Sequence, residues 1–305
     1  MRLALEPTPP FDARPTLAAL GGFAASPAAR VLEDDAFLQA WRPPARDGHD
    51  SLDPVVARVR FRGTIDRPRV DVAAAEPLGD EGRASLLEHL RAALALDVDT
   101  AALGRVDDPT FAPVYRALRG YHPPRFPTPF EAACWAVIRQ RTPLAFAEAS
   151  MARVVQLLGE RREGFGRSFT LFPEPAAIDD DARPALLAAT RNTRKVDRLV
   201  PLARAFAAVP AGWWQGASYP EAFRRLTAMP GLGPWSAELV LLRGLGRYER
   251  MPWTDTGALP ALSQLYTPGL SLARGSAREL AERYGWLQGL WLLYVKRYVF
   301  TLGRP

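Results

Sequence analysis

Alternating apolar and polar positions along the first 80 residues are typical of β-strands. Val56–Arg62 alternates strictly, with Ala57, Val59 and Phe61 on one side and three arginines on the other. Val70–Val72 is predicted as the returning strand of an antiparallel pair. The arginine side of Val56–Arg62 is expected to face solvent, and the alternative is that it faces DNA. Three weaker segments complete this region, namely strands over 3–5 and 30–32 and a short helix over 16–24.

From Asp80 the spacing of the apolar positions changes to that of α-helices. Leu86, Leu90 and Ala93 follow one another at intervals of four and three residues, which places them on one helix face. The proline-rich segment Tyr121–Pro129 is predicted to be an extended connector, because it can form neither a helix nor a central strand. Helices are expected after it over 130–140, 145–159, 182–190, 194–208, 220–229, 234–245, 256–266, 277–284 and 287–301.

Two of these helices begin with a capping-box pattern. Ser218 is followed by Glu221 and Ser276 by Glu279, in each case three residues after the serine. The pattern as a whole predicts an α+β fold, in which an N-terminal antiparallel β-sheet precedes a mainly α-helical region.

Composition narrows the class of protein. The chain has 305 residues, 48% of them hydrophobic, which suits a globular protein of about two domains. No apolar run reaches the length of about 18 residues that a membrane-spanning helix needs, and the first residues contain no apolar stretch long enough for a signal peptide. We therefore expect a cytoplasmic protein, located with the nucleoid.

The charged residues favour a phosphate-containing partner, and the few cysteines and histidines exclude several kinds of site. The net charge is +6, and because Lys195 and Lys296 are the only lysines, 37 of the 39 basic residues are arginines. A genome-wide bias in base composition accounts for such a ratio, yet the resulting surface of planar, bidentate cations still suits phosphate. Cys134 is the only cysteine and the three histidines lie far apart, so neither a disulfide, a four-cysteine cluster nor a zinc site is expected.

The segment 226–237 carries the clearest signal for chemistry. A helix is predicted to end near Met229, the glycines of Pro230–Gly233 form a tight turn, and a new helix begins at Pro234. Bare glycine N–H groups beside a helix N-terminus form an anion site that fits a backbone phosphate and reads no base. The alternative is a helix stop followed by a new helix, with no ligand.

A carboxylate follows about twenty residues later. Asp255 lies where a loop is expected to give way to a helix, so the helix N-terminus favours its ionised form. The alternative role for this residue is that of an N-cap.

The pattern Leu-x-x-x-Pro-Gly-x-Gly-x-Trp-x-Ala, followed by Pro-x-x-Asp, resembles the helix–hairpin–helix superfamily of DNA glycosylases. The nearest resemblance is to the bacterial 3-methyladenine DNA glycosylase II type and covers roughly residues 120–303. It includes the apolar helix ending in Gln140, the proline turn Phe172–Pro175 and the segment Arg194–Leu199. The resemblance implies a sheet domain over 1–115 and a glycosylase domain over 116–305, with two helical subdomains flanking a cleft.

The resemblance also implies base excision repair. An alkylated purine of the 3-methyladenine kind is flipped out of double-stranded DNA and excised, which leaves an abasic site. Asp255 matches the residue that stabilises positive charge on the sugar or assists the attacking water. Superfamily members that also nick the strand carry a lysine just after the hairpin, where this chain has Trp235, so we expect hydrolysis without lyase activity.

The matching positions give three groups of site residues. Those expected to bind DNA are Gln140, Arg141, Gly231, Leu232, Gly233 and Pro234. Those expected to line the substrate pocket are Trp235, Leu239, Thr256, Trp291 and Tyr294. The backbone carbonyls of Thr227, Met229 and Leu232 match those that hold a monovalent cation in relatives, and no organic cofactor is implied.

Several positions depart from the family pattern. Arg141 occupies the position of the residue that wedges into the duplex, where relatives commonly have Leu or Gln. Leu239 and Thr256 replace pocket tyrosines, and Val295 replaces a pocket tryptophan. Core packing is the alternative role for Trp235, Trp286 and Trp291.

Two other functions remain open at this point. One is a non-catalytic DNA lesion-binding or structure-binding protein of the same fold, and the other is a glycosylase for another lesion, such as uracil or hypoxanthine. A monomer acting on damaged double-stranded DNA, with no membrane partner, is expected in either case.

Overall fold

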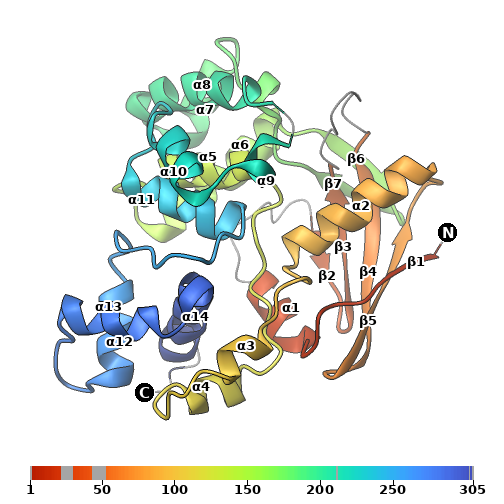
Figure 1. Cartoon of the computed structure of the whole chain (residues 1–305). Helices are drawn as coiled ribbons and strands as arrows, with labels where there is room; N and C mark the ends of the chain where they lie inside the picture. The colour runs from red at the N-terminus through yellow and green to blue at the C-terminus, as the bar shows by residue number, and fades with distance from the viewer. Residues whose placement is uncertain (1, 22–29, 43–52, 211, 302, 304–305) are drawn as a thin grey trace.

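The computed structural model describes residues 2–21, 30–42, 53–210, 212–301 and 303. A five-stranded antiparallel sheet in the order β1-β5-β4-β3-β2 is followed by a helical region, so the predicted α+β class is confirmed (Figure 1). The strands are β1 (Arg2–Leu5), β2 (Arg30–Leu32), β3 (Ala36–Trp41), β4 (Val55–Thr64) and β5 (Arg67–Ala74).

The sheet is covered on both faces. On one face, Leu86 and Leu90 of helix α2 (Asp80–Ala93) join a core with alternate residues of β4. On the other face, the hairpin of β6 (Arg161–Gly164) and β7 (Arg167–Thr170) packs through Phe169. All six positions of β3 are consequently buried. This burial on both sides explains why alternation did not reveal β3 in the sequence.

The arginine side of β4 is less solvated than predicted. Arg58 and Arg60 are only partly exposed and pair with Glu33 and Asp35, at 3.5 and 3.4 Å. The expected helix over 16–24 is present as α1 (Ala13–Gly21), and positions 22–24 lie outside the described residues.

The helical region lies on both sides of the extended connector that the prolines predicted. Before the connector come α3 (Ala101–Gly104) and α4 (Ala112–Ala117). After it come α5 (Pro129–Arg139), α6 (Leu144–Leu158), α7 (Arg183–Thr190), α8 (Thr193–Ala207), α9 (Trp213–Gly216), α10 (Tyr219–Thr227), α11 (Pro234–Leu239), α12 (Ala258–Tyr266), α13 (Arg274–Glu282) and α14 (Gln288–Lys296). Helices α11 and α14 each run on into a π-helical turn, over Val240–Gly244 and Arg297–Thr301. No helix in the described ranges is long and apolar enough to cross a membrane.

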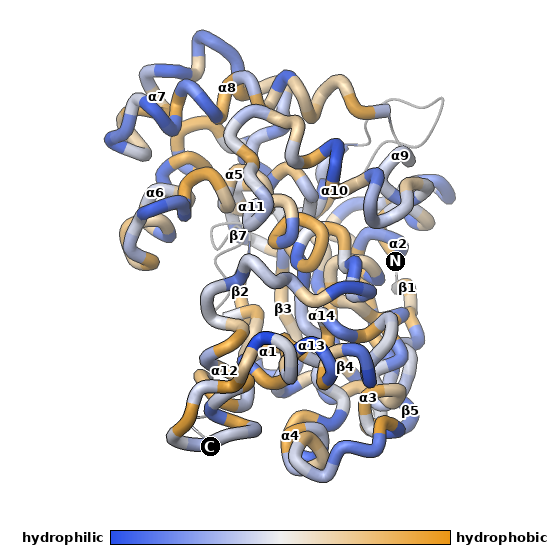
Figure 2. The backbone as a smooth tube through the Cα atoms, turned by 60° about the vertical axis from the view of Figure 1, so that its left-hand side comes forward, coloured by the Kyte–Doolittle hydropathy of each residue, from blue (hydrophilic) through white to orange (hydrophobic). Residues whose placement is uncertain are grey.

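Two hydrophobic cores organise these helices. The first joins α5, α6, α7, α8, α10 and α11, and the second joins α3, α4, α12, α13 and α14. Helix α5 is buried from Phe130 to Ile138, and its N-cap Thr128 accepts a hydrogen bond from the Glu131 backbone N–H at 3.1 Å. The peripheral helices instead alternate hydrophilic and apolar stretches along their length (Figure 2).

One of the two predicted capping boxes is confirmed. At the start of α10, the Ser218 backbone N–H donates to Glu221 Oε2 at 2.8 Å. The prediction at Ser276 is wrong, because α13 already begins at Arg274 and Ser276 lies within its first turn.

Replacement of Trp291 by Ala should lower the free energy of unfolding by about 3–5 kcal/mol, because it empties a buried site in the second core. Trp291 has no exposed surface and stacks on Tyr284 with the ring centroids 4.6 Å apart. Urea unfolding measures the change. Trp286→Ala is the matched control, since Trp286 is 58% exposed and its loss should cost less than about 0.5 kcal/mol. Equal losses for the two variants would contradict this assignment of the core.

Candidate active site

A cavity of about 1030 Å³ lies where the ends of several helices of the first core meet the segment Thr254–Thr256. It is lined by Arg139, Gln140, Arg141, Asn192, Arg194, Lys195, Arg198, Gly231, Leu232, Gly233, Pro234, Trp235, Ser236, Thr254, Asp255 and Thr256. The cavity therefore brings together the glycine turn, the predicted acid and the end of the apolar helix α5, although they are far apart in the sequence.

The glycine turn, Pro230–Gly233, has the geometry that the sequence predicts. Gly231 has φ +78°, and a Cβ there would lie 2.9 Å from Cβ of Arg198, so both the conformation and the space require glycine. The Leu232 N–H donates to the Met229 carbonyl at 3.2 Å and closes the turn. Within the described ranges, the N–H groups of Gly231 and Gly233 have no backbone acceptor and remain available to an anion.

Gln140 connects the turn to two other elements. Its Nε2 donates to the Gly231 carbonyl at 2.8 Å and to Ser236 Oγ at 3.1 Å, while its Oε1 accepts from Arg198 Nη1 at 2.7 Å. Both ends of the Gln140 amide are therefore engaged within the protein, so the side chain holds the turn in place. A contact between Gln140 and DNA stays a prediction.

Lys195 holds the chain that follows α5. Its Nζ donates to the Ile138 carbonyl and to Thr142 Oγ1. Burial lowers the pKa of Lys195, and the nearby charges of Arg139 and Arg198 lower it further. This lysine therefore has a structural role.

Arg141 stands out at the rim of the cavity because of its backbone. It is exposed and has φ +49°, a left-handed conformation that is unusual for a residue with a side chain. Ala95, Phe165 and Arg191 share this conformation, so it does not by itself mark a functional residue. The side chain of Arg141 is exposed and therefore accessible at the rim of the cavity.

Asp255 is held from both sides. Its Oδ1 accepts from the Gly257 N–H at 2.9 Å, and its Oδ2 accepts from Lys296 Nζ at 2.6 Å. The preceding residue is fixed as well, because the Thr254 N–H donates to Glu238 Oε2 of α11 at 2.9 Å. The loop that carries the acid is thus connected directly to the second helix of the hairpin.

Lys296 is the site residue that sequence reasoning missed. It lies outside the hairpin motif, 41 positions after Asp255, and motif matching assigned it no role. The available signal was its rarity, since it is one of two lysines in a chain with 37 arginines.

The structure separates the five predicted pocket residues. Trp235 and Thr256 line the cavity, whereas Leu239 is half-buried against the first core. Trp291 and Tyr294 have no exposed surface and belong to the second core. The prediction that they line the pocket is therefore wrong. Six of the nine positions of α14 are buried, including both aromatic ones, and the apolar pattern of the sequence does not distinguish its core aromatics from pocket aromatics.

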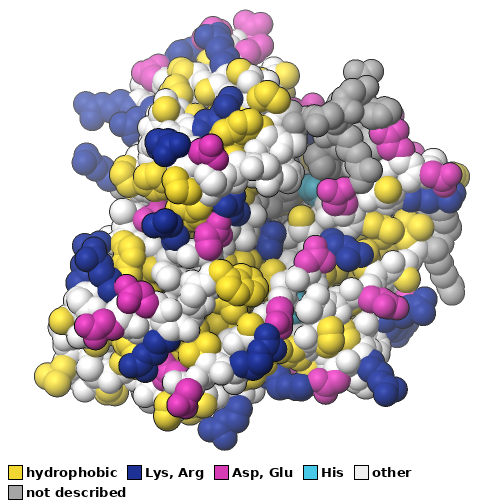
Figure 3. Space-filling view, viewed as in Figure 1, with side chains coloured by type: hydrophobic (Ala, Val, Ile, Leu, Met, Phe, Trp, Pro, Cys, Tyr) yellow, Lys and Arg dark blue, Asp and Glu magenta, His cyan; other side chains and the backbone are white. Residues whose placement is uncertain are grey.

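The charge of the cavity wall is strongly positive. Arg139, Arg141, Arg194, Lys195 and Arg198 contribute five cations, against the single carboxylate of Asp255. Lys and Arg side chains also project from the edge of the molecule on the side of α8 and α11 (Figure 3). A polyanion such as a phosphodiester backbone is the ligand that suits this wall.

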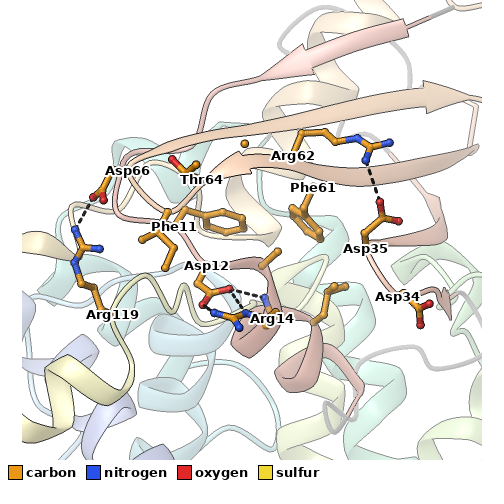
Figure 4. A pocket seen from close by; sticks show the side chains of 14 residues that line it. Phe11, Asp12, Arg14, Asp34, Asp35, Phe61, Arg62, Thr64, Asp66 and Arg119 are labelled. Carbon is orange, nitrogen blue, oxygen red and sulfur yellow. Dashed lines mark hydrogen bonds and ion pairs between the residues drawn. The ribbon is translucent and has the colours of Figure 1, made fainter.

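A second cavity, of about 570 Å³, lies between α1 and the β4–β5 hairpin (Figure 4). Its floor contains Phe11 and Phe61, and three pairs of opposite charges line it: Arg14 with Asp12, Arg62 with Asp35 and Arg119 with Asp66. The carboxylate of Asp34 also lines it, so this cavity carries more acidic than basic side chains and suits a polyanion less well than the first cavity does.

Known proteins resemble the chain in sequence and fold. The probable bifunctional transcriptional activator/DNA repair enzyme AlkA of Mycobacterium tuberculosis is 30% identical over 278 residues, covering 88% of this chain and 52% of that protein. The DNA-3-methyladenine glycosylase of Bacillus subtilis is 27% identical over 160 residues, covering 52% and 53%. The chain thus spans about half the length of these curated relatives.

A solved structure of a 3-methyladenine DNA-glycosylase from Archaeoglobus fulgidus matches the fold with a TM-score of 0.78 at 24% identity, covering 97% of both chains. No protein-family model matches the chain.

Gly231→Ala should destabilise the protein by about 1–2 kcal/mol or more, because a side chain there meets both a left-handed backbone and Arg198. Gly233→Ala is the matched control. Gly233 has φ −94° and open space around its Cβ position, so its unfolding midpoint should stay close to that of the wild type. Chemical denaturation of both variants checks the difference, and a larger loss at Gly233 would refute the described turn.

Proposed function

The chain belongs to the helix–hairpin–helix superfamily of DNA glycosylases, in its 3-methyladenine DNA glycosylase II type, and on this premise we propose that it excises damaged bases from duplex DNA. The proposed substrates are alkylated purines of the 3-methyladenine kind, and the proposed product is an abasic site. One observation carries the proposal: the acid Asp255 and the glycine turn line the same cavity of about 1030 Å³.

The proposed grip on DNA uses backbone groups. The unpaired N–H groups of Gly231 and Gly233, with Leu232 and Pro234 shaping the turn, would bind a backbone phosphate without reading sequence. Arg141 would fill the space that the flipped nucleotide leaves. The positive cavity wall would hold the flanking phosphates, and binding should therefore weaken steeply with salt.

The proposed chemistry follows from a fixed carboxylate in a cavity. As the bond between the base nitrogen and the sugar C1′ breaks, positive charge develops on the sugar, and the carboxylate of Asp255 stabilises it. The base leaves with the bonding electrons, water then adds at C1′, and the proton that this water loses passes to solvent. Trp235, the aromatic residue in the cavity wall, would stack on the flipped base, and Thr256 would border it.

We propose that strand cleavage is not part of this reaction. The position just after Pro234, where strand-nicking relatives carry a lysine, is Trp235. Lys296 reaches Asp255 from the opposite end of the region, at the end of α14, and contacts the acid itself.

We also propose a monovalent cation at the hairpin, held by the carbonyls of Thr227, Met229 and Leu232. Neutral carbonyl oxygens are hard donors that suit such an ion. The protein is proposed to act as a monomer, on DNA in the nucleoid. In the part of the chain that the structure describes, no cluster of three or more His, Cys, Asp or Glu side chains could hold another metal.

Asp255→Asn should reduce the single-turnover rate of base release by a factor on the order of 10² to 10³, because it removes one preorganised charge from the transition state. Release of free 3-methyladenine from methylated duplex DNA measures this rate. Asp66→Asn is the control, since Asp66 lies on the second cavity and should leave the rate unchanged. Unchanged turnover in Asp255→Asn would refute the proposed acid.

The product strand should remain intact until it is heated in alkali. Gel analysis of an end-labelled duplex, with and without alkaline treatment, tests whether excision stops at the abasic site. Direct nicking by the wild type would show lyase activity. Binding without release of alkylated, deaminated or oxidised bases would instead support the non-catalytic lesion-binding function.

A further inference from the structure

The acid in the cavity is already paired with a cation from another part of the chain. Lys296 Nζ lies 2.6 Å from Asp255 Oδ2, and the other oxygen of the carboxylate accepts the Gly257 N–H. The two side chains are 30% and 24% exposed, so solvent and a bound ligand can both reach the pair. The catalytic carboxylate and its partner therefore have no net charge together.

The position of Lys296 is built into the fold. Lys296 is the last residue of α14, and the preceding Tyr294 and Val295 are wholly buried in the second core. Gly257 leaves the necessary room, because a Cβ there would lie 3.3 Å from both Asp255 Oδ1 and Lys296 Nζ. The core thus directs this ammonium group at the acid.

The pair changes which bases the site should accept. A cationic alkylated base and its sugar carry a total charge of +1 at the transition state, whereas an uncharged base and its sugar carry none. A fixed ammonium next to the sugar opposes the first case more strongly than the second, because in the second case the negative charge that develops on the departing base offsets part of the repulsion. An unpaired carboxylate would favour the cationic base instead.

The remaining cavity wall gives a cationic base little compensation. Trp235 is the only aromatic side chain among the described lining residues, so attraction between a cation and aromatic rings is limited. The other charged side chains of the wall are basic.

We propose that Lys296 is a positioning and specificity-determining residue, which holds Asp255 in place and extends the range of excised bases to uncharged damaged ones. This inference rests on the proposed glycosylase function. Lys296 acts through Asp255 and through its charge, and it forms no bond to the substrate.

Comparing Lys296→Gln with Lys296→Arg tests the proposal. The probes are duplexes that contain 7-methylguanine, which is cationic, or hypoxanthine, which is uncharged, and the readout is kcat/KM for each. Lys296→Gln should shift the ratio by about tenfold toward 7-methylguanine, as expected for the loss of one charge near the reacting atoms. Lys296→Arg keeps the charge and should keep the ratio within about twofold of the wild type. Lys296→Met serves as a second neutral variant if the glutamine variant does not fold.

Three outcomes would overturn the inference. Equal losses on both substrates would show a merely structural lysine, and a wild type that releases only 7-methylguanine would show that uncharged bases are not accepted. A covalent adduct trapped by borohydride in the wild type, and absent from Lys296→Gln, would show a nucleophile. A wild type that releases neither base would refute the proposed function itself, which is a distinct result.

Discussion

The amide of Gln140 fixes three elements of the first core relative to one another. It ends α5 and is hydrogen-bonded to the glycine turn, to α11 through Ser236 and to α8 through Arg198. A partly buried amide that loses its partners is costly, so the three elements keep their mutual positions. Glu238 of α11 then accepts a hydrogen bond from the Thr254 N–H and so fixes the loop that contains Asp255. The glycine turn and Asp255 are therefore positioned by one continuous set of hydrogen bonds.

Hydrophobic packing supplies the other half of the site. The aromatic residues Trp291 and Tyr294 touch no part of the cleft, yet their burial fixes the helix that ends in Lys296. The packing of the second core thus determines where the charged group of Lys296 lies relative to Asp255. Within α14, Trp291 and Tyr294 therefore belong to the core, whereas Lys296 contacts the acid.

Local signals made most of the fold predictable from the sequence. Helix periodicity, the Ser218 capping box and the glycine turn are local patterns, and Asp255 stands at a fixed spacing after the turn. Strand β3 escaped because burial on both faces removes alternation. Lys296 escaped because its partner is 41 residues away, and only tertiary packing brings the two together. Motif spacing, likewise, could not show that the aromatics of α14 face inward.

The β6–β7 hairpin belongs to the helical region in sequence but packs on one face of the five-stranded sheet. It arises between α6 and α7, and a Cβ on Gly164 would come within 2.5 Å of the Val56 side chain in β4. Phe169 and Leu171 are buried against the same sheet face. Cutting the chain at the predicted domain boundary, between residues 115 and 116, would therefore expose this face of the sheet in one fragment and the apolar side of the hairpin in the other. The sheet and the helical region therefore cover each other's apolar surfaces, and loss of the sheet would leave the helical region with a water-exposed apolar patch.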